Sequence, residues 1–160
     1  MDFLHQFVQQ LINGVSLGSI YALIALGYTM IYGIIKLINF AHGDIYMVGA
    51  YIGFFAITRA GLSIVPALLI SMVVTGILGM IVERLAYKPL RHAPRISVLI
   101  TAIGVSFFLE YASMYFVSPT PRTFPEVIPS VAFNVGPFIV NGQQMLIMGI
   151  TLVLMLILTY

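Results

Sequence analysis

The feature that most restricts the fold is a short polar segment, residues 39–44, set between two apolar stretches. Apolar residues run up to Lys36, and after the segment only fourteen residues, 45–58, precede Arg59. At about 1.5 Å per residue, a helix of that length reaches ~21 Å, short of the ~30 Å hydrocarbon core of a bilayer. A crossing is long enough only if residues 37–58 span it together, which places the polar segment at membrane depth.

A polar segment at membrane depth requires a membrane protein, and the composition supports one. Of 160 residues, 61% are hydrophobic and 8% are charged, which is too little charge for a water-soluble surface. We therefore predict an all-α integral membrane protein, a polytopic helical bundle of about five transmembrane spans within residues 1–160. One span is broken near Asn39 to Asp44, and such a break is tolerated where it lines a cavity or is covered by other helices. The expected spans are 15–35, 37–58, 62–82, 96–117 and one that starts near Met145.

Two segments outside these spans have their own pattern. Residues 2–13 place apolar side chains at i, i+3 and i+4, which predicts an amphipathic elbow helix lying at the membrane interface. Residues 118–144 contain five prolines and are expected to form a long external loop, with 131–140 as the stretch that would pair as short strands. The chain ends inside an apolar run, so we expect further sequence after Tyr160, from this chain or from a partner.

The basic residues are distributed unevenly along the chain. Five of them, Lys36, Arg84, Lys88, Arg91 and Arg95, fall on one side of the predicted membrane, and only Arg59 and Arg122 fall on the other. This asymmetry predicts that residues 83–95 form a cytoplasmic loop and that the N-terminus lies outside. Within the loop, Tyr87 suits the membrane interface. The charged residues are either a solvated face or a docking surface for a cytoplasmic partner: Glu83, Arg84, Lys88 and Arg91. No aromatic or basic stripe indicates nucleic-acid binding.

The candidate functional residues are polar groups expected inside the membrane. Ionisable groups at that depth usually serve a function, so Asn39, His42, Gly43, Asp44 and Glu110 are candidates to line a substrate path. The alternative for residues 39–44 is a mutually hydrogen-bonded structural knot that breaks the helix. Glu110 lies in an apolar 22-residue stretch, on one helical face with Ser106. Four alternatives are open for this carboxyl group. It titrates, pairs with a basic group on another helix, or stays neutral inside the membrane, or it lies near the membrane surface at the interface.

Small residues recur along two of the predicted spans. Gly14 and Gly18 in the first span, and Gly49 and Gly53 in the second, are each four residues apart. Such spacing lets a second helix approach closely, and we interpret these glycines as helix-packing positions.

Several kinds of chemistry find no support in the sequence. No phosphate-binding loop occurs, because neither lysine follows a glycine, so ATP binding within these residues is not expected. The three histidines are scattered without metal-ligand spacing, there is no cysteine, and no nucleophile with its base can be argued from spacing. We therefore predict a transport subunit rather than an enzyme, with no metal and no cofactor of its own. An ion- or proton-coupled carrier or channel half that uses Asp44 and Glu110 remains an alternative, as does a packing subunit without a path.

Three stretches together resemble a known family: INGVSLGSIYALIALGYTMIYGIIKLINFAHGDIYMVGAY at 12–51, ERLAYKPLR at 83–91 and SVLITAIGVSFFLE at 97–110. They are similar to the membrane permeases of branched-chain amino-acid ABC importers, in particular the H-type subunit of the high-affinity leucine/isoleucine/valine system. Glu110 departs from this pattern, since many relatives carry a carboxamide there. Permeases for urea and short amides share the N-x-A-H-G pattern and are an alternative.

The resemblance implies a multi-pass permease in the bacterial inner membrane. It further implies a second, homologous permease, two ATPase subunits that bind ATP, and a periplasmic substrate-binding protein. Family members are longer, so the chain resembles their N-terminal half.

Overall fold

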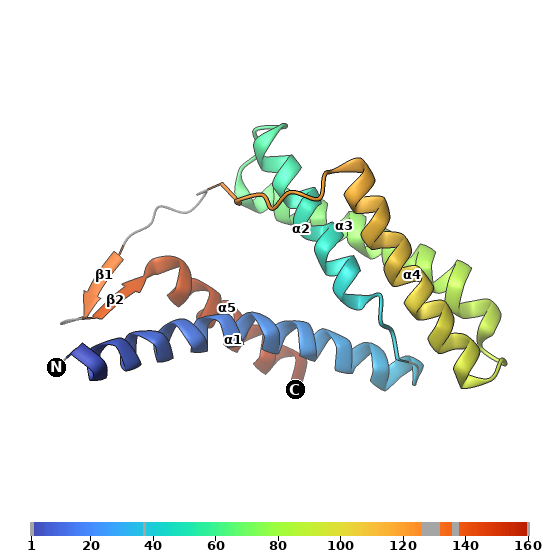
Figure 1. The fold of residues 1–160 in the computed structure, drawn as a ribbon, viewed down its shortest axis with the longest axis horizontal. Helices are drawn as coiled ribbons and strands as arrows, with labels where there is room; N and C mark the ends of the chain where they lie inside the picture. Colours follow the sequence, from blue (N-terminus) through green and yellow to red (C-terminus); the bar gives the residue numbers. More distant parts are fainter. Residues whose placement is uncertain (1, 37, 126–131, 136–137, 160) are drawn as a thin grey trace. The chain divides into compact units, whose positions relative to one another are not determined.

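The structure is a computed structural model that describes residues 2–36, 38–125, 132–135 and 138–159 (Figure 1). Helices dominate these residues, which confirms the predicted all-α class, and one short hairpin accompanies them. In chain order the elements are α1 (Asp2–Ile35), α2 (His42–Thr58), α3 (Ile64–Val82), the π-helical turn η1 (Glu83–Tyr87), the 3-10 turn η2 (Lys88–Leu90), α4 (Arg95–Phe116), β1 (Ala132–Val135), β2 (Phe138–Asn141) and α5 (Gly142–Thr159).

Three of the described helical segments are long and apolar enough to cross a membrane: Gln6–Ile34, Ile64–Leu90 and Arg95–Phe116. They correspond to the first, third and fourth predicted spans. The other two predicted spans are shorter helices, because α2 has 17 residues and the apolar part of α5 is Gly142–Leu158. Seventeen residues reach about 26 Å, so α2 alone falls short of the hydrocarbon core.

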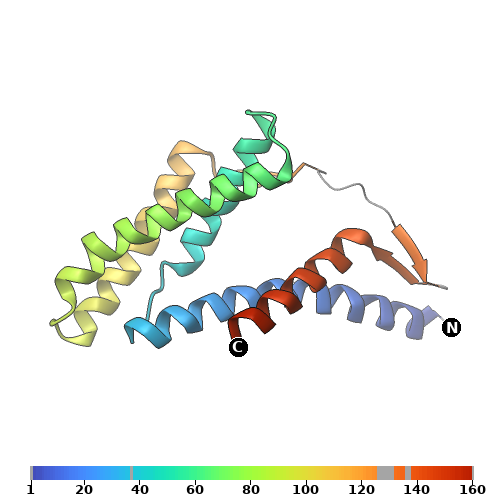
Figure 2. The same ribbon diagram turned by 180° about the vertical axis from the view of Figure 1, so that it is seen from behind.

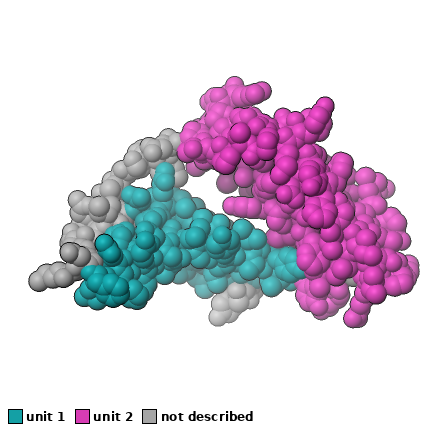
Figure 3. Space-filling model, viewed as in Figure 1, with its two compact units in different colours: residues 1–30, 128–160 teal, residues 31–127 magenta. Residues whose placement is uncertain are grey.

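The chain divides into two compact units, which Figure 3 colours separately. The first comprises Met1–Met30 and Ile128–Tyr160, and the second is Ile31–Val127. In the first unit, β1 and β2 pair antiparallel, with Ala132 opposite Asn141 and Val135 opposite Phe138. The expected pairing of short strands is therefore confirmed at residues 132–135 and 138–141, while residues 131, 136 and 137 lie outside the described residues.

A polar contact joins α1 to α5 within the first unit. The side-chain oxygen of Asn13 accepts hydrogen bonds from Gln9, at 3.5 Å, and from Gln144, at 3.1 Å. Further along the two helices, Ser16 and Thr151 are buried polar residues. Between membrane helices, small hydroxyl residues of this kind allow close approach, and amides form hydrogen bonds from one helix to the other.

The second unit is built on α2, α3 and α4, which Figure 2 shows from behind. Helix α2 packs on α3 through Gly49, whose carbonyl accepts a 2.7 Å hydrogen bond from Ser71 Oγ. The turn between these helices contains Gly61 at φ +64°, a conformation that glycine adopts without strain. A small core of Val82, Tyr87, Val98 and Ala102 joins the end of α3 and η1 to α4.

Two predicted boundaries differ from the structure. We expected residues 2–13 as an elbow helix separate from the span at 15–35, but α1 continues through both. No proline lies between them, and a single Gly14 costs a helix only about 1 kcal/mol. The elbow's location at a membrane interface stays a prediction.

The expected loop 83–95 is helical as far as Leu90, because η1 and η2 continue α3. Pro89 lies in the first positions of η2, where the missing N–H is least costly. The second predicted loop was the external loop at 118–144. Its residues 118–125 are described without helix or strand, and its residues 142–144 already belong to α5. Residues 126–131 of the predicted external loop lie outside the described residues.

Candidate functional site

The predicted break between the first two spans is present. Helix α1 ends at Ile35, and Lys36 then adopts the left-handed conformation, φ 59°, with its N–H bonded to Tyr32 O at 2.8 Å. This is a common way to end a helix, although glycine usually occupies the position. Residues 38–41 are described without helix, and α2 begins at His42. In this segment Ala41 is fully buried, and Asn39 and His42 are half-buried.

Asn39 fixes the break to the end of α3. Its side-chain oxygen accepts a hydrogen bond from the backbone N–H of Ala41, at 3.0 Å, and another from the hydroxyl of Tyr87, at 2.7 Å. The first is the local bond by which asparagine side chains stabilise turns. The second comes from a residue 48 positions away, on the π-helical turn η1, and π-helical turns often occur at functional sites. Sequence reasoning assigned Tyr87 to the membrane interface, whereas its side chain is buried in the protein.

Asp44 makes the second long-range bond of this region. It lies in the first turn of α2, where the helix dipole favours a negative charge, and it accepts a hydrogen bond from Ser106 on α4. The side chains of Asn39 and Asp44 thus bind other elements of the protein. Glu110 follows Ser106 by one helical turn and is partly exposed. Among the residues that the structure describes, Glu110 makes no ion pair.

A cavity of about 450 Å³ lies beside the break, bounded by the last turns of α1, the start of α2, and α3 with η1. Most of its wall is apolar or small, and four polar side chains line it at one end of α3. The lining residues are Ile31, Ile45, Met72, Thr75, Gly76, Gly79 and Val82, with Asn39, His42, Glu83 and Tyr87. Of the predicted path residues, the cavity brings together Asn39 and His42 and adds Glu83, which we had assigned to a cytoplasmic loop. Gly43, Asp44 and Glu110 do not line it.

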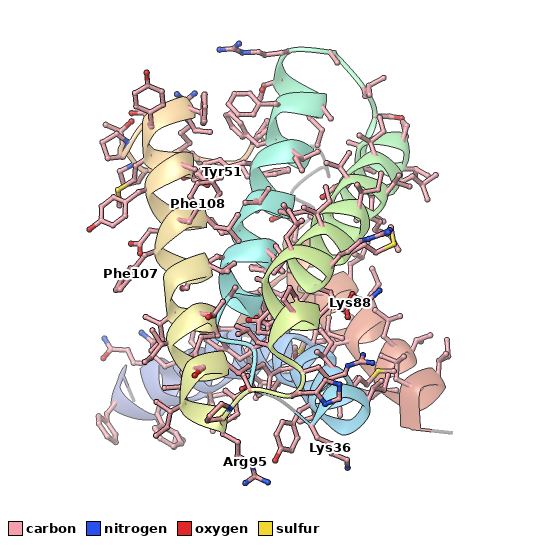
Figure 4. All side chains as sticks on the ribbon, turned by 90° about the vertical axis from the view of Figure 1, so that its right-hand side faces the viewer. Lys36, Tyr51, Lys88, Arg95, Phe107 and Phe108 are labelled. Carbon is pink, nitrogen blue, oxygen red and sulfur yellow. The ribbon has the colours of Figure 1, made fainter. Side chains whose placement is uncertain are left out.

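The remaining predicted loop residues lie at the surface. Arg91 and Glu83 form an ion pair at 3.9 Å between partly exposed groups, which contributes little to stability. Arg84 and Lys88 are exposed, and Figure 4 shows Lys88 on the outside of the helical bundle. The loop's role in docking a partner stays a prediction.

The four predicted packing glycines differ in their surroundings. A Cβ on Gly49 would lie 2.9 Å from Thr75 Cγ2 and 3.4 Å from Ser71 Oγ, so this glycine permits the close approach of α2 and α3. At Gly14, Gly18 and Gly53 nothing lies within 4 Å of such an atom. Packing of these three against another chain stays a prediction.

A cluster that was not predicted from the sequence joins the C-terminal ends of α2 and α4 in the second unit. The guanidinium of Arg122 lies over the rings of Phe54 and Phe55, at 5.9 and 5.8 Å, and Arg59 lies over Phe55 at 5.1 Å. Arg122 also donates a 3.0 Å hydrogen bond to the carbonyl of Val117, at the end of α4. The start of the predicted external loop is therefore held against α2 and α4 by cation–π and capping contacts.

Apolar helices of membrane-crossing length indicate a multi-pass membrane protein, in which a helix break lies beside a cavity. The sequence profile described as branched-chain amino acid transport system / permease component matches residues 10–160. The chain belongs to this family, which confirms the resemblance found in the sequence.

Similar proteins carry names that agree with the family. The chain is 44% identical over 172 positions to the high-affinity branched-chain amino acid transport system permease protein BraD of Pseudomonas aeruginosa, covering 99% of this chain and 56% of that protein. It is 43% identical over 146 positions to permease protein LivH of Escherichia coli K12, covering 86% and 46%. LivH of Salmonella typhimurium is 42% identical over the same length. The chain thus spans about half the length of these relatives. No solved structure matches it.

Proposed function

We propose that the chain is part of a permease subunit of an ATP-driven importer for branched-chain amino acids in the bacterial inner membrane. The names of its relatives, at 42–44% identity, are the observation that carries this proposal. The path forms together with a second, homologous permease, and a periplasmic binding protein delivers the amino acid. Two separate ATPase subunits bind and hydrolyse ATP, since these 160 residues contain no phosphate-binding loop.

The cavity beside the break suits such a substrate. Small-molecule sites are typically pockets of roughly 300–1,000 Å³ with apolar walls and a few polar groups that fix orientation. Here Ile31, Ile45 and Met72 would contact an aliphatic side chain. In this proposal Glu83 accepts hydrogen bonds from the substrate ammonium group, and His42 and the Asn39 amide donate to its carboxylate. Asp44 and Tyr87 hold the break in position through Ser106 and Asn39.

The test is transport by the complete importer in proteoliposomes, with radiolabelled leucine as the substrate. Uptake is expected to require both ATP and the binding protein, and Glu83→Gln and His42→Ala are expected to lower it at least tenfold in assembled complexes. Robust leucine uptake without ATPase subunits would contradict the proposal. Uptake of urea at the rate of leucine would show that the substrate class is wrong.

Glu110→Gln separates this function from a proton-coupled carrier. Glu110 lies outside the cavity and makes no ion pair among the described residues, so the importer is expected to retain ATP-driven uptake within about twofold. A carrier that uses Glu110 as its proton site would lose a flux driven by a pH gradient in the same variant.

A further inference from the structure

A second cleft in the Ile31–Val127 unit is lined by two cations. It has a volume of about 360 Å³ and lies between the end of α1, the connection to α2, and the first turns of α4. Its lining residues are Tyr32, Lys36, Ile38, Arg95, Val98 and Leu99. Figure 4 shows Lys36 and Arg95 at the same end of the helical bundle.

The cleft favours an anion. No acidic residue lines it, and among the residues that the structure describes neither Lys36 nor Arg95 has an ion-pair partner. Helix α4 begins at Arg95, and Pro94 before it provides no side-chain cap for the first N–H groups. These groups carry a partial positive charge that adds to the charges of the two side chains.

The other walls and the depth of the cleft indicate which anion it would take. Val98 is buried, Ile38 and Leu99 are partly exposed, and Tyr32 adds a ring with a polar hydroxyl, so an apolar surface adjoins the cations. One membrane-length segment ends at Ile34, and another begins at Arg95. In a bilayer crossed by these segments, both cations would lie at the segment ends, near the lipid head groups.

We propose that this cleft binds an anionic phospholipid, phosphatidylglycerol or cardiolipin, from the cytoplasmic leaflet. Lys36 and Arg95 bind the phosphate, and an acyl chain lies along Ile38 and Leu99. Basic pockets between membrane helices on the cytoplasmic side are a known means of binding such head groups. This proposal does not depend on which solute the permease carries.

These 160 residues offer an internal control, because they contain two lysines, Lys36 and Lys88, and Lys88 lies outside the cleft. The full-length protein, with the subunits that purify with it, is placed in nanodiscs of phosphatidylcholine, either alone or mixed with about 30% cardiolipin. Sulfo-NHS-acetate then acetylates exposed amines, and mass spectrometry follows both lysines. Cardiolipin is expected to slow acetylation of Lys36 at least fivefold relative to Lys88. Equal slowing of both lysines would indicate only a general surface charge and would overturn the proposal.

Variants test the same site by lipid retention in native mass spectrometry. Each cation near an anionic surface contributes a factor of about five to binding, so Lys36→Gln with Arg95→Gln is expected to weaken cardiolipin retention roughly 25-fold. Lys88→Gln is the matched control and should retain the lipid. If the double variant does not assemble, the Lys36 protection in the wild-type protein decides alone. Protection of Lys36 in phosphatidylcholine alone would indicate that a protein subunit covers the cleft, and protection by sodium phosphate would indicate that free phosphate binds there. Either result would overturn the proposal.

Discussion

Replacement of Gly49 by alanine tests the contact that holds α2 against α3. The new methyl group would lie 2.9 Å from Thr75 Cγ2. Thr75 cannot easily turn away, because its branched side chain is stiff in a helix and its hydroxyl donates to Ser71 O at 2.5 Å. Overpacking of this kind costs about 1–3 kcal/mol, whereas alanine gains about 1 kcal/mol over glycine in helix propensity. Gly49→Ala is therefore expected to destabilise the protein by about 0–2 kcal/mol.

Gly53→Ala is the matched control, one turn further along the same helix. Nothing lies within 4 Å of the added atom, so only the propensity gain of about 1 kcal/mol remains. The two variants should thus differ by about 1–3 kcal/mol, the cost of overpacking. Thr75→Ser removes Cγ2 but keeps the hydroxyl, and it should recover part of the loss in the Gly49→Ala background. Equilibrium unfolding by dodecyl sulfate in mixed micelles measures these differences. A Gly49→Ala protein as stable as Gly53→Ala would show that the contact with Thr75 does not limit the packing of α2 on α3.

Two further predictions concern contacts between distant segments. Tyr87→Phe is expected to cost about 1 kcal/mol and Asn39→Ala about 2 kcal/mol, because the latter also leaves the Ala41 N–H without its partner. In a double-mutant cycle in mixed micelles the two changes should couple by about 1 kcal/mol, and full additivity would show that this bond contributes nothing. Arg122→Ala is expected to speed protease cleavage within residues 118–125, since the variant loses the Val117 cap and both ring contacts. Unchanged cleavage would mean that these contacts do not hold the segment.

The parts of the fold that were predictable depend on local sequence. Apolar length alone located the three membrane-length helices, since a run of about 20 apolar residues has few other uses. The same arithmetic found the break before α2, because residues 45–58 are too few to cross a bilayer. The helical continuation of α3 to Leu90 was missed because residues 83–95 were expected to form a loop, whereas Pro89 in that segment occupies an early position of a 3-10 turn.

The candidate site was only partly predictable, because its contacts join residues far apart in the chain. Asn39 and His42 were found from their polarity in an apolar setting. Tyr87 and Ser106 reach the break from 48 and 62 positions away, and no local pattern reveals such partners. Ser106 had one detectable signal, since it shares a helical face with Glu110. The place of Glu83 in the cavity wall follows from the helical continuation of α3, which was not foreseen.

The proposed function requires that the segment before α2 lies inside the protein, beside a path for solute. The 160 residues contain no cysteine, so His42→Cys in the full-length importer provides a thiol at the cavity wall without background from this segment. Inside-out vesicles are loaded with leucine and binding protein or left without them, ATP and a membrane-impermeant thiol reagent are added outside, and Arg91→Cys is the exposed control. His42→Cys is expected to be labelled slowly relative to Arg91→Cys, with a further change when leucine is transported. Labelling as fast as at Arg91→Cys and unaffected by leucine would show that the segment is exposed and lies away from the path.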